Sequence, residues 1–341
     1  MSLSLDPPAD FATLRTMMQA LPGPDDSAMA AAQVRQSQLT KPPGSLGRLE
    51  ELAVWLAGWQ GAEKPVLDRV QVLIAAGNHG VTAQNVSAFP SAVTAQMVGN
   101  FAAGGAAINQ LAKEAGASLD VLPLELERPT GDFTQGPAMT EAECVAALGE
   151  GFAAVMPDTQ LLAIGEMGIG NTTAAAALCA ALTDRDAARW CGPGTGLDAE
   201  GVSRKAAVVS AGLARHRACL DDPPAVLAAL GGRELAAMAG AILAARLHKI
   251  PVVLDGYVTG AAALVLHAMQ EGALDHCVTG HCSAEPPHRQ LLTHFGMEPL
   301  LNLGMRLGEG SGAALAVPLL RAAVATHNGM ATFAEAGVSG G

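Results

Sequence analysis

The fold of this chain is indicated most clearly by Val70-Gln71-Val72-Leu73-Ile74-Ala75-Ala76, which leads directly into Gly77-Asn78-His79-Gly80. The apolar run is short and almost continuous, and it ends in glycines and polar residues. Such a run is typical of a strand that is buried on both faces, as in a parallel sheet covered by helices. The stretch therefore predicts one strand of an α/β fold with polar residues at its carboxyl end.

The same pattern of apolar run, glycine-rich turn and helical segment returns along the chain. Ser118–Leu124 is a second run, Leu161–Ile164 leads into Gly165–Gly168, and Pro251–Leu254 leads into Asp255-Gly256. Alternating strands and helices predict a parallel sheet with helices on both faces, a three-layer α/β/α arrangement. Ligands of such sheets bind beyond the carboxyl ends of the strands, which is where these polar turns fall.

The first sixty residues carry a different pattern. Apolar positions at three- and four-residue spacing predict helices over Phe11–Leu21, over Ser27–Leu39, and from Arg48 to about Trp59. Between the last two, Thr40–Gly47 contains a proline pair and two glycines, which predicts a loop. The amino-terminal region is therefore expected to be helical.

Composition excludes several classes of protein. The formal net charge is −12 over 341 residues without clusters of Lys and Arg, which argues against a nucleic-acid partner. The longest apolar stretch, Leu235–Leu254, is interrupted by Arg246 and Lys249, so no membrane span is predicted. Met1–Asp6 lacks the features of a secretory signal, and the six cysteines follow no framework spacing. We therefore expect a cytoplasmic protein with reduced thiols.

Two glycine-rich segments are candidate anion loops. Gly165-Glu166-Met167-Gly168-Ile169-Gly170-Asn171-Thr172-Thr173 follows a strand and opens an alanine-rich helix, where backbone N–H groups suit a phosphate or carboxylate. The alternative is an ordinary turn, because Asn and Thr are good helix caps. Gly192-Pro193-Gly194-Thr195-Gly196-Leu197 is followed by Arg204-Lys205, so a cation can reach a bound phosphate. Here the alternative is a surface loop with a solvated basic pair.

A third polar turn contains histidines and cysteines. His276-Cys277 and His281-Cys282 resemble metal ligands, but their spacing matches no standard zinc pattern, and one turn rarely supplies four ligands. No metal site is predicted. Gly280-His281-Cys282-Ser283-Ala284-Glu285 can instead offer a hydroxyl and an N–H group to an anion.

One carboxylate lies between glycines in Arg306-Leu307-Gly308-Glu309-Gly310-Ser311-Gly312-Ala313-Ala314. The glycines allow a tight turn and a close approach to a ligand, and a helical run follows. Glu309 is therefore either an N-terminal helix charge or a catalytic base. Several anion loops together with this glutamate fit a small phosphorylated substrate and an acid–base residue better than a protein-binding module.

Five segments resemble a known family, the nicotinate-nucleotide–dimethylbenzimidazole phosphoribosyltransferases, in the family's order and without a large gap. They are Lys41-Pro42-Pro43-Gly44-Ser45-Leu46-Gly47-Arg48-Leu49-Glu50, Asn78-His79-Gly80-Val81, Gly165–Gly168 with Asn171-Thr172-Thr173, Pro251–Gly256, and Met305–Ala316. Each motif alone is of modest specificity, and together they are highly specific.

The resemblance implies an enzyme that transfers phosphoribose from nicotinate mononucleotide to 5,6-dimethylbenzimidazole, inverting the anomeric carbon, in cobalamin biosynthesis. It implies a homodimer, no cofactor, and a doubly wound, Rossmann-like sheet with a smaller helical domain from both chain ends. We place the small domain at residues 1–65 with 315–341, and the catalytic domain at residues 66–314.

The resemblance also assigns residues. Glu309 matches the general base, and Glu166 and Lys205 match further catalytic residues. Phe89 and Leu307 are predicted to contact the base. The nucleotide and its phosphate are assigned to Gly168, Asn171, Thr172, Gly194, Thr195, Gly196, Ser283 and Gly310. The alternatives are an enzyme of the same fold acting on another azole, a ribosyl hydrolase, and a non-catalytic protein that binds a benzimidazole or the nucleotide.

Overall fold

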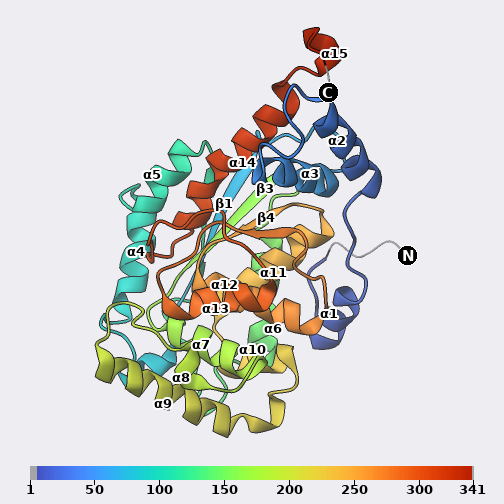
Figure 1. The fold of residues 1–341 in the computed structure, drawn as a ribbon. Coiled ribbons are helices and arrows are strands. Elements are labelled where there is room, and N and C mark those ends of the chain that lie inside the picture. Colours follow the sequence, from blue (N-terminus) through green and yellow to red (C-terminus); the bar gives the residue numbers. More distant parts are fainter. Residues whose placement is uncertain (1–5, 340–341) are drawn as a thin grey trace.

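The computed structural model describes residues 6–339 and contains a five-stranded parallel sheet at its centre (Figure 1). The strand order is β2-β1-β3-β4-β5, so the chain winds outward in both directions from β1 and β3. The strands are β1 (Val70–Gly77), β2 (Ser118–Leu124), β3 (Leu161–Met167), β4 (Val252–Leu254) and β5 (Cys277–Thr279). The predicted doubly wound α/β fold is confirmed.

Helices cover both faces of this sheet, which makes three layers. Alternate residues of β1 point to opposite faces: Leu73 and Ala75 belong to one hydrophobic core, and Val72 and Ile74 to the other. The first core is closed by α6 (Glu141–Ala153), α7 (Asn171–Leu182), α10 (Pro223–Leu230), α11 (Arg233–Leu247) and α12 (Tyr257–Met269), and the second by α3 (Arg48–Gln60), α5 (Ala107–Glu114) and α14 (Ser311–Gly329).

The abundance of alanine and glycine allows the helices to pack at short range. Added Cβ atoms at Gly151 of α6 and Gly240 of α11 would lie 1.8 Å and 1.9 Å from a carbonyl oxygen of the opposite helix. Only glycine permits this approach, and every residue of α11 is buried as a result. None of the helices among residues 6–339 has the length and hydropathy needed to cross a bilayer.

Residues 26–60 and the carboxyl-terminal helices lie together at one end of the molecule, whereas α1 (Phe11–Met18) lies apart from them (Figure 1). Leu39 pairs with Thr332 in an isolated antiparallel bridge, and the Arg35 guanidinium donates to the carbonyl oxygens of His327, Asn328 and Met330. The elements there are α2 (Asp26–Gln38), α3, the end of α14, and α15 (Phe333–Ala336). Because α14 runs unbroken through residue 315 and its first turns pack on the sheet, the proposed domain boundary stays a prediction.

The remaining elements are α1 (Phe11–Met18), α4 (Ala92–Ala102), α8 (Ala187–Trp190), α9 (Ala199–Arg215), α13 (Pro286–Phe295) and two short 3₁₀ helices, η1 (Gly80–Gln84) and η2 (Arg217–Cys219). The three helices predicted before residue 60 are present, although α1 ends at Met18 instead of Leu21. The prediction about a secretory signal concerns residues that lie almost wholly outside the described range.

Candidate active site

A cavity of about 690 Å³ opens at the carboxyl ends of the strands. Its wall combines Glu166 and Met167 at the end of β3, the turn that follows them, Gly256 after β4, and His281 and Ser283 after β5. Strand register explains this convergence, because Ile164 lies beside Leu254 and the next residues of both strands therefore emerge together. The loops that carry Phe89, Gly194 and Leu307 complete the wall. The cavity lies where parallel sheets bind their ligands.

One side of the cavity is suited to an anion. The Lys205 ammonium on α9 is buried and donates to the Thr172 hydroxyl (3.1 Å) and to the Gly192 carbonyl oxygen (3.0 Å). Helix α7 begins at Asn171 directly after Gly170, which provides no side-chain cap, and Thr172 of its first turn lines the cavity, so this helix N-terminus lies at the cavity wall. Gly194 follows with φ +55°, and a Cβ atom there would lie 3.0 Å from the lysine nitrogen.

The charge of Lys205 is only partly compensated by the protein. Burial lowers the pKa of Lys205, and the Glu285 carboxylate opposes that effect. Glu285 is itself held by the Gly194 N–H group at 3.0 Å, so it shapes the loop as well as balancing the charge. A buried ammonium beside a hydroxyl and a helix N-terminus is an arrangement that binds phosphate.

Glu166 and Glu309 form the acidic part of the wall. The Asn171 amide donates to one Glu166 carboxylate oxygen, and the other oxygen lies against Gly308. Burial, and then the charge of Asp255, raises the pKa of Glu166 to about 8. Below that pH these surroundings favour the neutral acid form of Glu166, whereas a cation bound nearby favours the carboxylate.

Glu309 occupies a strained turn. Gly308, Glu309 and Gly310 have φ angles of +79°, +61° and +73°, and this left-handed region is unfavourable for glutamate. The Glu309 N–H group donates to the Glu166 carbonyl oxygen at 3.2 Å, which fixes the turn against β3. Glu309 is 6% exposed, and burial followed by the charge of Asp255 raises its pKa. Strain of this kind is common at functional sites.

Asp255 follows β4 and contacts the Gly308–Gly310 turn and the start of α14. Its carboxylate accepts the N–H groups of Gly310 (3.1 Å), Gly312 (2.7 Å) and Ala313 (3.0 Å) at the start of α14. The His281 ring nitrogen Nε2 lies 3.5 Å away. Burial raises the pKa of Asp255, and His281 and the three donors oppose that shift.

Apolar side chains surround the mouth of the cavity. Phe89 is 52% exposed and Leu307 is 55% exposed, although both line the cavity. The Thr195 hydroxyl binds Ser87 Oγ (3.1 Å) and the Ala88 N–H group (3.2 Å), which ties the Phe89 loop to the glycine loop. An exposed apolar mouth is suited to a flat aromatic ligand.

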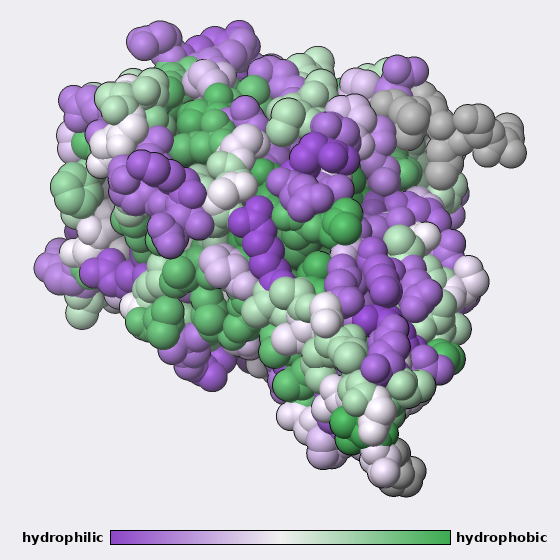
Figure 2. All heavy atoms as spheres, turned by 90° about the horizontal axis from the view of Figure 1, so that it is seen from above, coloured by the Kyte–Doolittle hydropathy of each residue, from purple (hydrophilic) through white to green (hydrophobic). Residues whose placement is uncertain are grey.

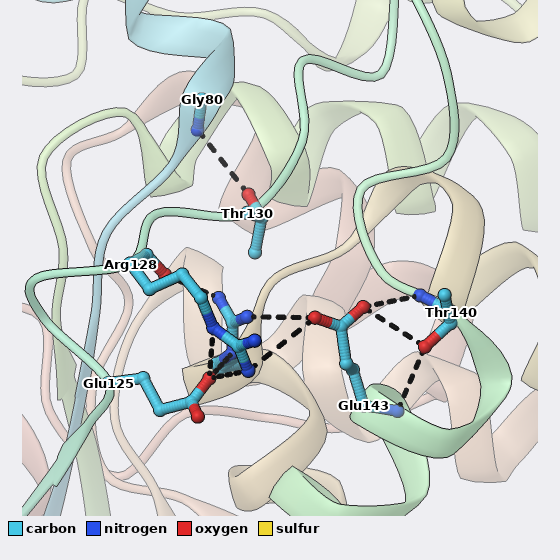
Figure 3. Close-up of polar contacts among 7 residues, drawn as sticks. Gly80, Glu125, Arg128, Thr130, Thr140 and Glu143 are labelled. Atoms are coloured by element: carbon cyan, nitrogen blue, oxygen red, sulfur yellow. Dashed lines mark hydrogen bonds and ion pairs between the residues drawn. The ribbon is translucent and has the colours of Figure 1, made fainter.

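A polar network holds the segment between β2 and α6 beside the turn after β1 (Figure 3). Arg233 at the start of α11 bonds Glu125 (2.9 Å) and Glu143 (3.3 Å) and thereby holds the segment between β2 and α6. That segment reaches the β1 turn, where the Gly80 N–H group donates to the Thr130 hydroxyl at 3.4 Å. The network supports the scaffold, since none of these residues lines the cavity.

The structure brings most of the predicted site residues together. Those that line the cavity are Phe89, Glu166, Gly168, Asn171, Thr172, Gly194, Thr195, Ser283, Leu307 and Glu309. Lys205 lies directly behind Thr172, Gly310 forms the buried start of α14, and Gly196 is exposed outside the wall. His276 does not join His281: it is buried and bonds the Ile242 carbonyl oxygen of α11. Within residues 6–339, no group of three His, Cys, Asp or Glu side chains is placed to hold a metal.

The sequence assigned no individual role to Asp255, Tyr257 and Arg306, nor to His281 and Glu285, although the last two belong to the Gly280–Glu285 turn proposed to hold an anion. Asp255 had a usable signal, because it comes directly after a buried strand and begins a polar turn. The Arg306 guanidinium donates to the Gly194 carbonyl oxygen at 3.3 Å, so it links two loops across the cavity. No local pattern predicts that contact, since the two residues lie far apart in the sequence.

Comparison with known proteins gives consistent matches over nearly the whole chain. A family model described as phosphoribosyltransferase matches residues 21–338. Nicotinate-nucleotide–dimethylbenzimidazole phosphoribosyltransferases of Novosphingobium aromaticivorans and Cereibacter sphaeroides are 58% and 59% identical to the chain; each alignment covers 98% of the chain, and 98% and 99% of the relative. The crystal structure of CobT from Thermus thermophilus superimposes with a TM-score of 0.86 at 46% identity, covering 92% of this chain and 100% of that one.

Proposed function

Because the chain belongs to the phosphoribosyltransferase family, we propose that it transfers phosphoribose from nicotinate mononucleotide to 5,6-dimethylbenzimidazole, releasing nicotinate. The product would be alpha-ribazole 5′-phosphate, used in cobalamin biosynthesis. The resemblance first seen in five sequence segments is confirmed by the family match. That the chain is a phosphoribosyltransferase is established by its family, and the substrates and residue roles are the proposal.

One observation carries the proposal: a single cavity has a cationic end and an acidic end. Lys205, Thr172 and the start of α7 offer a place for the 5′-phosphate. Glu166 and Glu309 line the same cavity, and the apolar side chains of Phe89 and Leu307 stand at its mouth, where an aromatic base can lie. A phosphorylated ribose bridging these two ends would have its anomeric carbon near the carboxylates.

The chemistry suits these residues. Nicotinate leaves from a pyridinium that is already cationic, so the glycosidic bond is weak and positive charge moves to the ribose as it breaks. Glu166 lies in the wall where that charge would develop, and a nearby cation favours its ionised form. In this proposal Glu166 becomes a carboxylate when nicotinate mononucleotide binds, and then stabilises the oxocarbenium-like transition state.

Glu309 is proposed as the general base. One benzimidazole nitrogen attacks the anomeric carbon, and the other nitrogen must lose its proton to a group within hydrogen-bond reach. The raised pKa of Glu309 makes its carboxylate a stronger base than an exposed glutamate. Attack on the face opposite the departing nicotinate would invert the configuration from beta to alpha.

The homodimer, the domain division and the cytoplasmic location also belong to the proposal. Hydrophobic side chains stay exposed on the part built from both chain ends, among them Val34 and Val338. Figure 2 shows hydrophobic areas between hydrophilic ones on the face that this part presents. Such areas favour association with a second copy, and sedimentation of the purified protein tests it.

The function is tested by incubating the protein with nicotinate mononucleotide, with and without dimethylbenzimidazole, and separating the products. Nicotinate release that depends on the base, with a product of alpha configuration by NMR, supports the proposal. Release without base would indicate a hydrolase, and faster transfer to another azole would indicate a different acceptor. Tight binding of either ligand without nicotinate release would favour a non-catalytic binding protein.

A further inference from the structure

The Pro251–Gly256 motif contributes a carboxylate to which no role has yet been assigned. We propose that Asp255 is a positioning residue, which holds the strained Gly308–Gly310 turn so that Glu309 points at the attacking base. The inference rests on the proposed role of Glu309 and deepens it. Asp255 is 1% exposed and its side chain does not line the cavity, so it acts through the turn and not on the substrate.

The geometry is that of a helix cap supplied from a distant part of the chain. Gly310 precedes α14 and has no side chain to cap it, so the first N–H groups of that helix need another acceptor. Asp255, 55 positions earlier, accepts the Gly310 N–H group with one oxygen and those of Gly312 and Ala313 with the other. The Gly310 bond falls on the residue directly after Glu309, so it constrains the peptide that orients the base.

The turn needs such a constraint because its backbone is unfavourable. Three successive residues have positive φ angles, and the central one is glutamate. A left-handed glutamate is retained only where the surrounding contacts over-determine it. On one side the Glu309 N–H group is bonded to β3, and on the other the Gly310 N–H group is bonded to Asp255. Without the second bond, the turn can relax to a conformation with negative φ that redirects the carboxylate.

His281 completes the arrangement beneath the turn. Its ring is 1% exposed, neither ring nitrogen has a hydrogen-bond partner, and Nε2 lies 3.5 Å from Asp255. A Cβ atom on Gly312 would lie 2.0 Å from the ring, so glycine at that position is needed for the histidine to fit beneath α14. Charged or titratable groups beside the turn thus include Glu166 at the end of β3, Asp255 directly after β4 and His281 after β5.

The experiment measures kcat and both KM values for Asp255→Asn, Asp255→Ala and Glu309→Gln, and for the double variant Asp255→Asn/Glu309→Gln. Without this acceptor the turn can shift, and the resulting misplacement of Glu309 is expected to lower kcat about 10- to 100-fold. The KM for nicotinate mononucleotide should change less than about threefold. Asp25→Asn is the matched control, because Asp25 lies outside the cavity and caps α2 by accepting the Ala28 N–H group at 2.9 Å. The kcat of this variant should stay within about twofold of the parent.

The double variant separates this inference from the proposed function. If Asp255 acts through Glu309, adding Asp255→Asn to the Glu309→Gln enzyme should lower kcat by less than a further factor of about three. Equal losses in both backgrounds would refute the positioning role while leaving Glu309 as the base. A Glu309→Gln enzyme within a few-fold of the parent would instead refute the base assignment.

A second variant keeps the test valid if Asp255 substitutions impair folding. Gly310→Ala retains the N–H group and Asp255 but strains the turn, since φ there is +73°. The nearest atom to a Cβ at this position would be the flexible end of Ile74 at 3.0 Å, so folding should survive. The same fall in kcat with an unchanged KM is expected, and full activity in the folded variant would overturn the inference.

Discussion

Gly165 of β3 offers a substitution that disturbs the Glu309 turn without touching the cavity. A Cβ atom there would lie 2.1 Å from the Gly310 nitrogen, 2.4 Å from its Cα and 2.8 Å from the Glu309 carbonyl carbon. Real Cβ contacts under 3.0 Å essentially never occur, and here the opposing atoms are backbone. In Gly165→Ala the turn must therefore retreat from β3 by about 1 Å.

The expected loss of activity follows from that displacement. A misplacement of about 1 Å at a reacting group can cost about 100-fold in rate, so kcat should fall by about that factor. Overpacking a buried site also costs about 1–3 kcal/mol of folding stability, which a domain of ordinary stability survives. Activity is measured as steady-state transfer to dimethylbenzimidazole, well below the melting temperature, with the folded fraction measured by circular dichroism.

The control is Gly136→Ala, because an added Cβ atom at Gly136 meets nothing within 4 Å. It should leave kcat within about twofold of the parent. A folded Gly165→Ala protein with kcat within about threefold of the parent would contradict this expectation, since the contact distances leave the turn no room to stay in place.

Three further predictions concern the charged residues of the cavity. Glu309→Gln should lower kcat about 100-fold or more, because a positioned general base contributes that much; transfer rates at saturating base measure it. Lys205→Met should raise the KM for nicotinate mononucleotide at least about 10-fold and leave the KM for dimethylbenzimidazole nearly unchanged, and an equal rise in both would contradict the phosphate assignment. Because the folded pKa of Glu166 is about 8 against an ordinary 4.5, its folded form binds a proton more tightly, and stability is lost as the pH rises through that window. The free energy of unfolding, measured in urea, should therefore fall less between about pH 5 and pH 8 for Glu166→Gln than for the parent. An identical dependence on pH in the two proteins would show that Glu166 is not held neutral.

Much of the fold could be predicted from the sequence because the patterns that indicate it lie in consecutive residues. The run at Val70–Ala76 predicts a strand buried on both faces, and the observed residues of β1 contribute to both cores. The segments Gly165–Thr173 and Gly192–Leu197 could be proposed as candidate anion loops because glycine density and a following helix are properties of consecutive residues. Since parallel strands point the same way, polar turns placed directly after strands were also predicted to meet at one edge of the sheet.

Contacts between residues far apart in the chain could not be predicted from the sequence. Asp255 appeared only as part of a motif, and its bonds to the start of α14 depend on β3, β4 and α14 being neighbours. The domain boundary at residue 315 stays a prediction, since α14 continues through that position and its first turns pack on the sheet.

For Glu309, the residue type, the flanking glycines and the position before a helix were all present in the linear chain. Its left-handed backbone, its burial and the Asp255 charge that raises its pKa arise only in the folded molecule. A pKa and a strained φ depend on the field and contacts of residues brought together by folding, so no local pattern contains them. A local pattern specifies which backbone conformations are possible, and packing against β3 and Asp255 selects one of them.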